Sequence, residues 1–171
     1  GLTLADGYTT ASEGAGVRND GILSLIECTI MDCSSDARGG GLSNIGTALL
    51  ERSTVMNNTA TDIGGGITTQ GGSLTLINST VSGNVSDNSG GGIYCFNSIS
   101  LIHTTISNKT GTYGGGIRVQ GSDPISFEKS IVAGNSGLSG YEAIWNGSTV
   151  ITSGGGNLIG RNTNASASFP T

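Results

Sequence analysis

Gly64-Gly65-Gly66-Ile67, followed by Ser73-Leu74-Thr75-Leu76 and then by Asn78-Ser79-Thr80-Val81-Ser82-Gly83-Asn84, is the segment from which the fold can be predicted. The same pattern returns along most of the chain. The last glycine of each cluster recurs at intervals of 25, 25, 26 and 24 residues, at Gly16, Gly41, Gly66, Gly92 and Gly116. A fixed period of this length, with several positions in phase, is typical of a protein in which each repeat stacks on the one before.

The spacing of apolar residues within a repeat indicates which kind of stack this is. Leu74 and Leu76 lie two residues apart, which is the period of a β-strand, and no segment has the helical period. Gly, Asn, Asp and Ser separate the short apolar segments and favour turns. We therefore predict an all-β parallel β-helix (solenoid) of about six coils of about 25 residues, with about three short strands in each coil.

Alternation along a strand predicts which side chains face the interior. We take the column of Val81 as inward, since it is apolar in every repeat: Ile30, Val55, Val81, Ile106 and Val132. The position two residues earlier is then also inward, and its small side chains could hydrogen-bond from coil to coil: Cys28, Ser53, Ser79, Thr104 and Ser130. An asparagine column closes the strand at Asn58, Asn84 and Asn135; Cys33 takes this place in the first repeat, and Asn108 falls one residue early.

The outward positions supply the candidate surface residues. One column is polar throughout: Glu27, Arg52, Asn78, His103 and Lys129. A polysaccharide lyase or hydrolase needs clustered carboxylates with a cation, or a carboxylate pair across the scissile bond. Since this column has one carboxylate and the only histidine, we predict a solvated face and no catalytic residue. Arg52, His103 and Lys129, together with Tyr141 and Trp145, stay as candidate surface-binding residues.

A row of threonines forms the other outward column, at Thr29, Thr54, Thr80 and Thr105, before Ile131. Regular threonine rows on a flat β-face bind ice in some solenoids. Two parallel threonine columns would make a convincing case for such a face, and the polar column described above is the neighbour that the sequence suggests. We therefore expect no flat matching surface, and the β-propensity of threonine explains the row.

Composition excludes several classes of function. Seven Lys and Arg residues, a net charge of −5 and a pI near 4.5 leave no basic footprint for nucleic acid. No apolar run is long enough to span a membrane, so we expect no membrane insertion by this segment. Asp36, Asp62 and Asp87 fall at nearly matching places and could hold calcium, but solvated turn residues are the preferred interpretation. We predict no other cofactor.

Three cysteines make an odd count. Cys28 and Cys95 fall at inward positions, and Cys33 falls in the bend column. The preferred interpretation is two buried free thiols and one bend residue. A bridge between Cys28 and Cys33 is the alternative, although it would strain the bend.

The repeat also defines the domain organisation. We predict one domain over residues 1–160, with regular coils to residue 135, an irregular closing coil over 136–160 and a polar C-terminal tail over 161–171. Gly1-Leu2-Thr3-Leu4 aligns with Asn78-Ser79-Thr80-Val81, so the chain starts inside a strand. Such an open end presents unpaired backbone groups. We expect either a preceding segment or another chain to stack there.

These motifs carry a family resemblance. The combination of Gly-Gly-Gly-Ile with Asn-Ser-Thr-Val-Ser-Gly-Asn resembles the repeats of bacterial surface proteins of the right-handed parallel β-helix, pectin-lyase-like class, in the style of polymorphic outer-membrane proteins. Gly1-Leu2-Thr3-Leu4-Ala5-Asp6-Gly7-Tyr8 resembles the segment that starts their glycine-rich coils. Ser130-Ile131-Val132-Ala133-Gly134-Asn135 and Asn157-Leu158-Ile159-Gly160 resemble their closing segments. The resemblance implies a right-handed fold and an extracellular, cell-surface location, and it transfers no catalytic residue.

Two functions follow as hypotheses. The first is a non-enzymatic structural module, such as a surface stalk, adhesin or fibre subunit, which associates end to end with itself or with adjoining segments of a larger chain. The second is a carbohydrate-binding or polysaccharide-degrading module that uses one sheet face for glycans.

Overall fold

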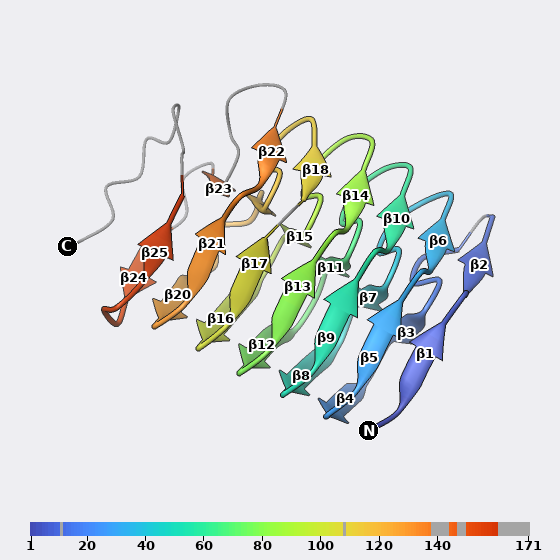
Figure 1. Ribbon diagram of the computed structural model, residues 1–171, viewed down its shortest axis with the longest axis horizontal. Helices are drawn as coiled ribbons and strands as arrows, with labels where there is room; N and C mark the ends of the chain where they lie inside the picture. Colours follow the sequence, from blue (N-terminus) through green and yellow to red (C-terminus); the bar gives the residue numbers. More distant parts are fainter. Residues whose placement is uncertain (11, 108, 138–143, 147–149, 161–171) are drawn as a thin grey trace.

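The protein is a parallel β-helix in the computed structural model, which describes residues 1–10, 12–107, 109–137, 144–146 and 150–160 (Figure 1). The predicted fold class is confirmed: the described residues form parallel strands and no helix, wound into about six turns of roughly 26 residues. The strands of successive turns stack into four sheets, here called A, B, C and D in the order in which the chain first enters them.

Each sheet receives one strand from every turn. Sheet A contains β1 (Thr3–Ala5), β5 (Thr29–Met31), β9 (Thr54–Met56), β13 (Thr80–Ser82), β17 (Thr105–Ser107), β21 (Ile131–Ala133) and β25 (Leu158–Ile159). Sheet B contains β2 (Tyr8–Thr9), β6 (Ser34–Ser35), β10 (Thr59–Ala60), β14 (Val85–Ser86), β18 (Thr110–Gly111) and β22 (Ser136–Gly137).

The other two sheets complete the turn. Sheet C contains β3 (Val17–Asn19), β7 (Leu42–Asn44), β11 (Ile67–Thr69), β15 (Ile93–Cys95), β19 (Ile117–Val119) and β23 (Ile144–Asn146). Sheet D contains β4 (Ile22–Ile26), β8 (Thr47–Glu51), β12 (Ser73–Ile77), β16 (Ser98–Ile102), β20 (Ile125–Glu128) and β24 (Ile151–Ser153). We call β1–β4 turn 1, β5–β8 turn 2, and so on to β21–β24, which is turn 6.

Each turn has four strands, where the sequence predicts about three. The additional strands are those of sheet B, which are two residues long. A strand this short shows no period of two and cannot be recognised from alternation. It is separated from sheet A by a turn whose residue adopts the left-handed conformation, for example Asn57 (φ 56°) or Gly83 (φ 65°).

The interior matches the predicted columns. The Val81 column is at most 1 % exposed in all five turns from Ile30 to Val132. The hydroxyl column is also inward and bonds from turn to turn as predicted, through the backbone. The N–H of Ser53 donates to Ser79 Oγ at 3.1 Å, and Ser79 Oγ lies 2.8 Å from the carbonyl of Ile77, to which it donates. Each hydroxyl therefore links two backbone groups.

The asparagine column forms a second ladder inside the helix. The backbone N–H and Nδ2 of Asn58 both donate to Asn84 Oδ1, at 2.9 and 3.0 Å. Cys33 occupies the first position, and its N–H donates to Asn58 Oδ1 at 3.0 Å. In the fifth turn Lys109 takes this position and is buried, which agrees with Asn108 falling one residue early; Asn108 itself lies outside the described residues.

Glycine is required where turns approach most closely. A Cβ on Gly65 would lie 2.1 Å from the carbonyl oxygen of Val85, and its neighbour Gly64 has a φ of +64°. Only glycine has no Cβ to clash at Gly65, and only glycine adopts the positive φ of Gly64 without a steric penalty. This is the physical reason for the repeated glycine clusters.

The three cysteines are free, as preferred from the sequence. Cys95 is fully buried, and burial raises the pKa of its thiol to about 12. Cys28 is half-buried in the hydroxyl column. The alternative of a bridge between Cys28 and Cys33 does not occur.

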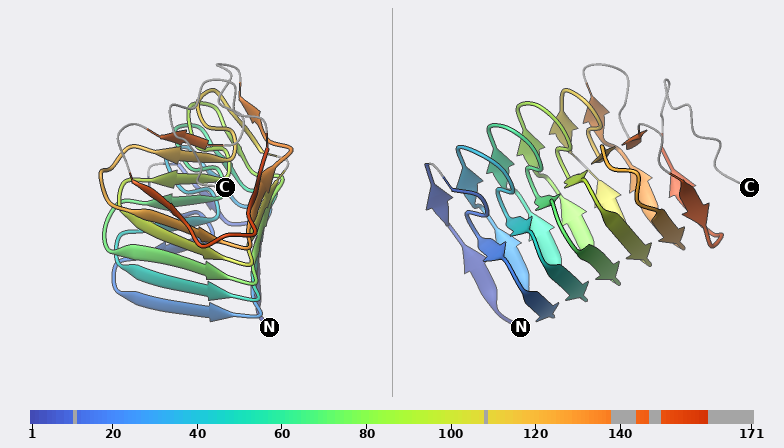
Figure 2. Two further views of the ribbon diagram at one scale, coloured as in Figure 1. Left: turned by 90° about the vertical axis from the view of Figure 1, so that its left-hand side faces the viewer. Right: turned by 180° about the vertical axis from the view of Figure 1, so that it is seen from behind.

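The described residues among 136–160, namely 136–137, 144–146 and 150–160, continue the stack. They supply one strand to each sheet, β22, β23, β24 and β25, in register with the preceding turn. Strands β1 and β25 lie at opposite ends of sheet A (Figure 2). The predicted tail over 161–171 lies outside the described residues.

Candidate functional site

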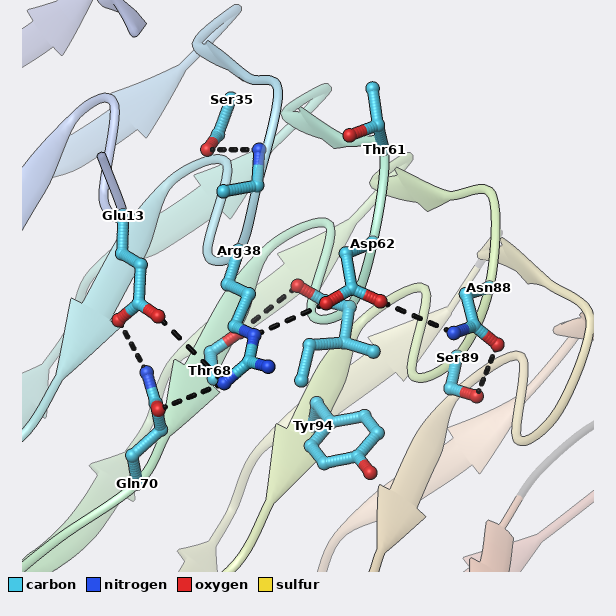
Figure 3. Close-up of polar contacts among 12 residues, drawn as sticks. Glu13, Ser35, Arg38, Thr61, Asp62, Thr68, Gln70, Asn88, Ser89 and Tyr94 are labelled. Atoms are coloured by element: carbon cyan, nitrogen blue, oxygen red, sulfur yellow. Dashed lines mark hydrogen bonds and ion pairs between the residues drawn. The ribbon is translucent and has the colours of Figure 1, made fainter. Parts of the chain in front are cut away.

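A polar cluster covers the outer face of sheet C near its first strands (Figure 3). Ser43 and Thr68 are the middle residues of β7 and β11, and each is 0 % exposed although it points away from the interior. Ser43 Oγ donates to Glu13 Oε2 at 3.1 Å, and Thr68 Oγ1 donates to the carbonyl of Ile63 at 3.1 Å. Side chains from the loops before sheet C therefore close over this part of the sheet.

The cluster joins four turns. Arg38 from turn 2 donates through Nε to Asp62 Oδ2 at 3.1 Å and through Nη1 to Gln70 Oε1 at 3.2 Å. Gln70 Nε2 donates to Glu13 of turn 1, and Asn88 Nδ2 of turn 4 donates to Asp62 Oδ1 at 3.2 Å. We call these five residues the polar clamp.

The side chains of the polar clamp bond to one another, which indicates a structural role. Both carboxylates already accept hydrogen bonds, and Arg38 lies between them, 3.8 Å from Glu13 Oε1 and 3.1 Å from Asp62 Oδ2. A general acid and base need a reacting group within reach, whereas here each carboxylate is bonded to another part of the clamp. Separate surface ion pairs contribute about 0–1 kcal/mol each, and a network that spans several turns contributes more. The arrangement holds turns together.

Further along sheet C the outer face becomes aromatic. Tyr94 of β15 is in register with Thr68, and its ring centroid lies 4.9 Å from that of Phe96. Its hydroxyl donates to Gln120. Trp145 of β23 is in register with Arg118, which in turn is in register with Tyr94, so the candidate Trp145 belongs to this column of the sheet. Tyr141 lies outside the described residues.

The other candidate surface residues lie at a turn. Arg52, His103 and Lys129 follow the strands of sheet D and have φ values of 47°, 50° and 46°. The predicted position on a strand face is wrong, because the strand ends before these residues and its alternation does not extend to them. Arg52 pairs with Glu27 at 3.0 Å and with Glu51, and Lys129 pairs with Glu128 at 3.4 Å. These turns stack in one column, with Asn78 between Arg52 and His103 and with Lys129 next after His103.

The three aspartates proposed for calcium do not share a column. The N–H of Asp36 bonds to sheet B of turn 1 and that of Asp87 to turn 3, so these two lie two turns apart, with Thr61 between them. Asp62 is one residue out of phase and belongs to the polar clamp. Within the described part of the chain, no three His, Cys, Asp or Glu side chains gather closely enough to hold a metal ion.

Lys109 was not identified from the sequence. It is 1 % exposed, and its Nζ has no hydrogen-bond partner among the described residues. Burial lowers the pKa of its amine to about 6. In the next turn Asn135 Oδ1 also has no donor within the described ranges, so the asparagine ladder is interrupted here. The repeat period could have identified this position, since Lys109 follows Asn84 by 25 residues, which is one repeat.

Comparisons with known proteins found no relative of this chain. No protein-family model, no curated protein and no solved structure matches this chain. In the described residues no helix has the length and hydropathy to cross a membrane.

Proposed function

We propose that this chain is a non-enzymatic structural module of the extracellular surface, a rigid stalk or fibre segment of the pectin-lyase-like β-helix type. Its turns are bonded to one another through the backbone, the hydroxyl column, the asparagine ladder and the polar clamp. A stack bonded in this way resists bending and keeps a fixed length. Such a module would hold the structures attached to its two ends at a fixed distance from each other.

The observation that carries this proposal is the exposed surface of turn 1. Strands β1, β2, β3 and β4 are the terminal strands of their sheets. Eight large hydrophobic side chains are exposed in the described part of the chain, and half of them belong to turn 1: Leu2, Tyr8, Ile22 and Ile26. A free β-edge with apolar side chains favours pairing with another strand. We therefore propose that another turn stacks on turn 1, end to end, from a second copy of the chain or from an adjoining segment of a larger chain.

A proline at the free edge tests this stacking. The carbonyl of Leu2 and the N–H of Asp6 bond to turn 2, so the alternation of bonding along a strand directs the N–H of Thr3 toward the free edge. Thr3→Pro removes that donor and leaves the bonds to turn 2 intact. The wild-type chain is expected to form threads in negative-stain electron microscopy, and Thr3→Pro to form short rods. A wild-type mass that stays monomeric in light scattering at all concentrations would contradict end-to-end stacking.

The second candidate function is glycan binding on sheet C. The aromatic pair of Tyr94 and Phe96 beside the amide of Gln120 favours it, since sugar-binding sites combine aromatic surface with a few polar groups. Tyr94 is only 6 % exposed, so the half-buried Phe96 would provide the contact. Binding on a glycan array that is lost in Phe96→Ala and retained in Lys129→Ala would support this function. An array without binding would exclude it.

A further inference from the structure

The outer face of sheet A consists of two columns that run along the stack. The first column is in register through β1, β5, β9, β13 and β17: Thr3, Thr29, Thr54, Thr80 and Thr105. The second column, two residues later, contains Ala5, Met31, Met56, Ser82, Ser107 and Ala133. Figure 1 shows the strands of this sheet side by side along the length of the molecule.

This arrangement corrects an expectation from the sequence. The polar column of Arg52, His103 and Lys129 was expected to lie beside the threonines and to disrupt any flat surface. Those residues lie at left-handed turns that border one edge of sheet A. The true neighbour of the threonine column is the second column, and neither column contains an Asp, Glu, Lys or Arg.

The threonine hydroxyls are available to a ligand. Thr29, Thr54, Thr80 and Thr105 are half-buried, and no hydrogen bond links their hydroxyls to another group in the part of the chain that the structure describes. In contrast, the inward hydroxyls of Ser53 and Ser79 are bonded to the backbone. Threonine is stiff at χ1, so a row of these side chains holds its hydroxyls and methyls in a fixed array.

The uncharged character extends beyond sheet A. From turn 3 onward the exposed or half-buried positions of sheet B are also neutral: Thr59, Val85, Thr110 and Ser136. The charges nearest to this face on that side are Asp6 and Asp32, at the turns of the first two coils. The face from turn 3 to turn 5 is therefore neutral, with Thr54, Thr80 and Thr105 along it, and Ile131 takes the threonine position in turn 6.

We infer that this face binds the surface of ice. Strands in a sheet repeat every 4.7–4.9 Å, which is close to the repeat of water oxygens on hexagonal ice. Hydroxyls at that interval can take positions in the lattice while the methyls between them exclude liquid water. Charged groups would order their own hydration shell and break this match. A crystalline polysaccharide is less suited as a partner, because neither column contains an aromatic ring on which sugars could stack.

Two lysine substitutions in the same turn test the inference. Thr80→Lys introduces a charge in the threonine column of β13, whereas Thr75→Lys introduces the same charge at an outward, half-buried threonine of β12 in sheet D. The wild-type chain and Thr75→Lys are expected to concentrate in slowly growing ice and to inhibit recrystallisation. Thr80→Lys is expected to reduce partition into ice at least about tenfold. Equal unfolding midpoints of the two variants would show that both are folded.

Several results would overturn the inference. The first is a wild-type chain that is excluded from ice. The second is an equal loss of partition in Thr75→Lys and Thr80→Lys. The third is a lateral dimer in analytical ultracentrifugation that Thr80→Lys abolishes, which would assign the face to a second copy. The fourth is retention on crystalline cellulose or chitin that Thr80→Lys abolishes, which would assign it to a polysaccharide.

Discussion

Lys109 places an amine in the interior of the β-helix, at the position that Asn58, Asn84 and Asn135 hold in other turns. The amine has no partner among the described residues, and the pKa of about 6 results from its burial alone. An unfolded lysine keeps its ordinary pKa of 10.5, so between these values the unfolded chain binds more protons than the folded chain. The stability of the wild-type protein should therefore rise as pH increases from 6 to 10.5.

Replacing this lysine should remove both the free-energy cost of burying its amine and the resulting pH dependence of stability. Lys109→Asn is expected to stabilise the protein by on the order of 3–5 kcal/mol at pH 7, and by less near pH 10. Urea unfolding at several pH values measures the effect. Lys129→Asn, at an exposed position, serves as the control and should leave the pH dependence unchanged. Parallel stability curves for the wild type and Lys109→Asn would contradict this account.

The left-handed turns between sheets D and A give a second prediction at the scale of the residue. Non-glycine residues in this conformation cost roughly 1–2 kcal/mol each. His103→Gly should relieve that strain and raise stability by about 0.5–1 kcal/mol, after allowing for the greater freedom of glycine when unfolded. His103→Val should lower stability, because a β-branched residue disfavours a φ of 50°. A lower urea midpoint for His103→Gly than for the wild type would contradict the assigned turn.

At the scale of the element, the asparagine ladder links strands of consecutive turns. Asn84 accepts two hydrogen bonds from Asn58 and donates one to the carbonyl of Val55 at 3.0 Å. Asn84→Ala leaves these buried groups without partners and should cost about 3 kcal/mol. Asn135→Ala is the matched control: its Oδ1 already lacks a donor within the described residues, and its Nδ2 makes one bond to Ile106. Equal losses in urea unfolding would show that the ladder is not the source of stability.

At the scale of the whole molecule, stability should differ along the stack, since each turn contacts only its neighbours. The cysteines report this difference. Cys28 is half-buried, Cys33 is buried in turn 2, and Cys95 is buried in turn 4. Under native conditions a thiol reagent should modify Cys28 first, Cys33 next through fraying of the exposed end, and Cys95 last. Mass spectrometry of peptides during labelling gives the order, and equal rates for Cys33 and Cys95 would argue for a single cooperative opening.

Much of this architecture could be predicted from the sequence, because the repeat period determines which residues of consecutive turns stack on one another. The inward columns of Val81 and Ser79 follow from alternation within a strand. The same rule failed at His103, where the strand had ended, and at the two-residue strands of sheet B, which are too short to alternate. The polar clamp could not be predicted, since Glu13, Arg38 and Gln70 occupy different places in their repeats and meet only through loop conformation.

The break in the asparagine ladder has a consequence for a stalk under load. Tension along the stack would be carried by the bonds between consecutive turns, and the rung at Lys109 holds fewer of them than the rung at Asn84. A pulling force should therefore part the molecule first at turn 5, while turns 1 to 4 stay joined by the polar clamp. In the proposed stalk, the interrupted rung would therefore be the place that yields first under tension.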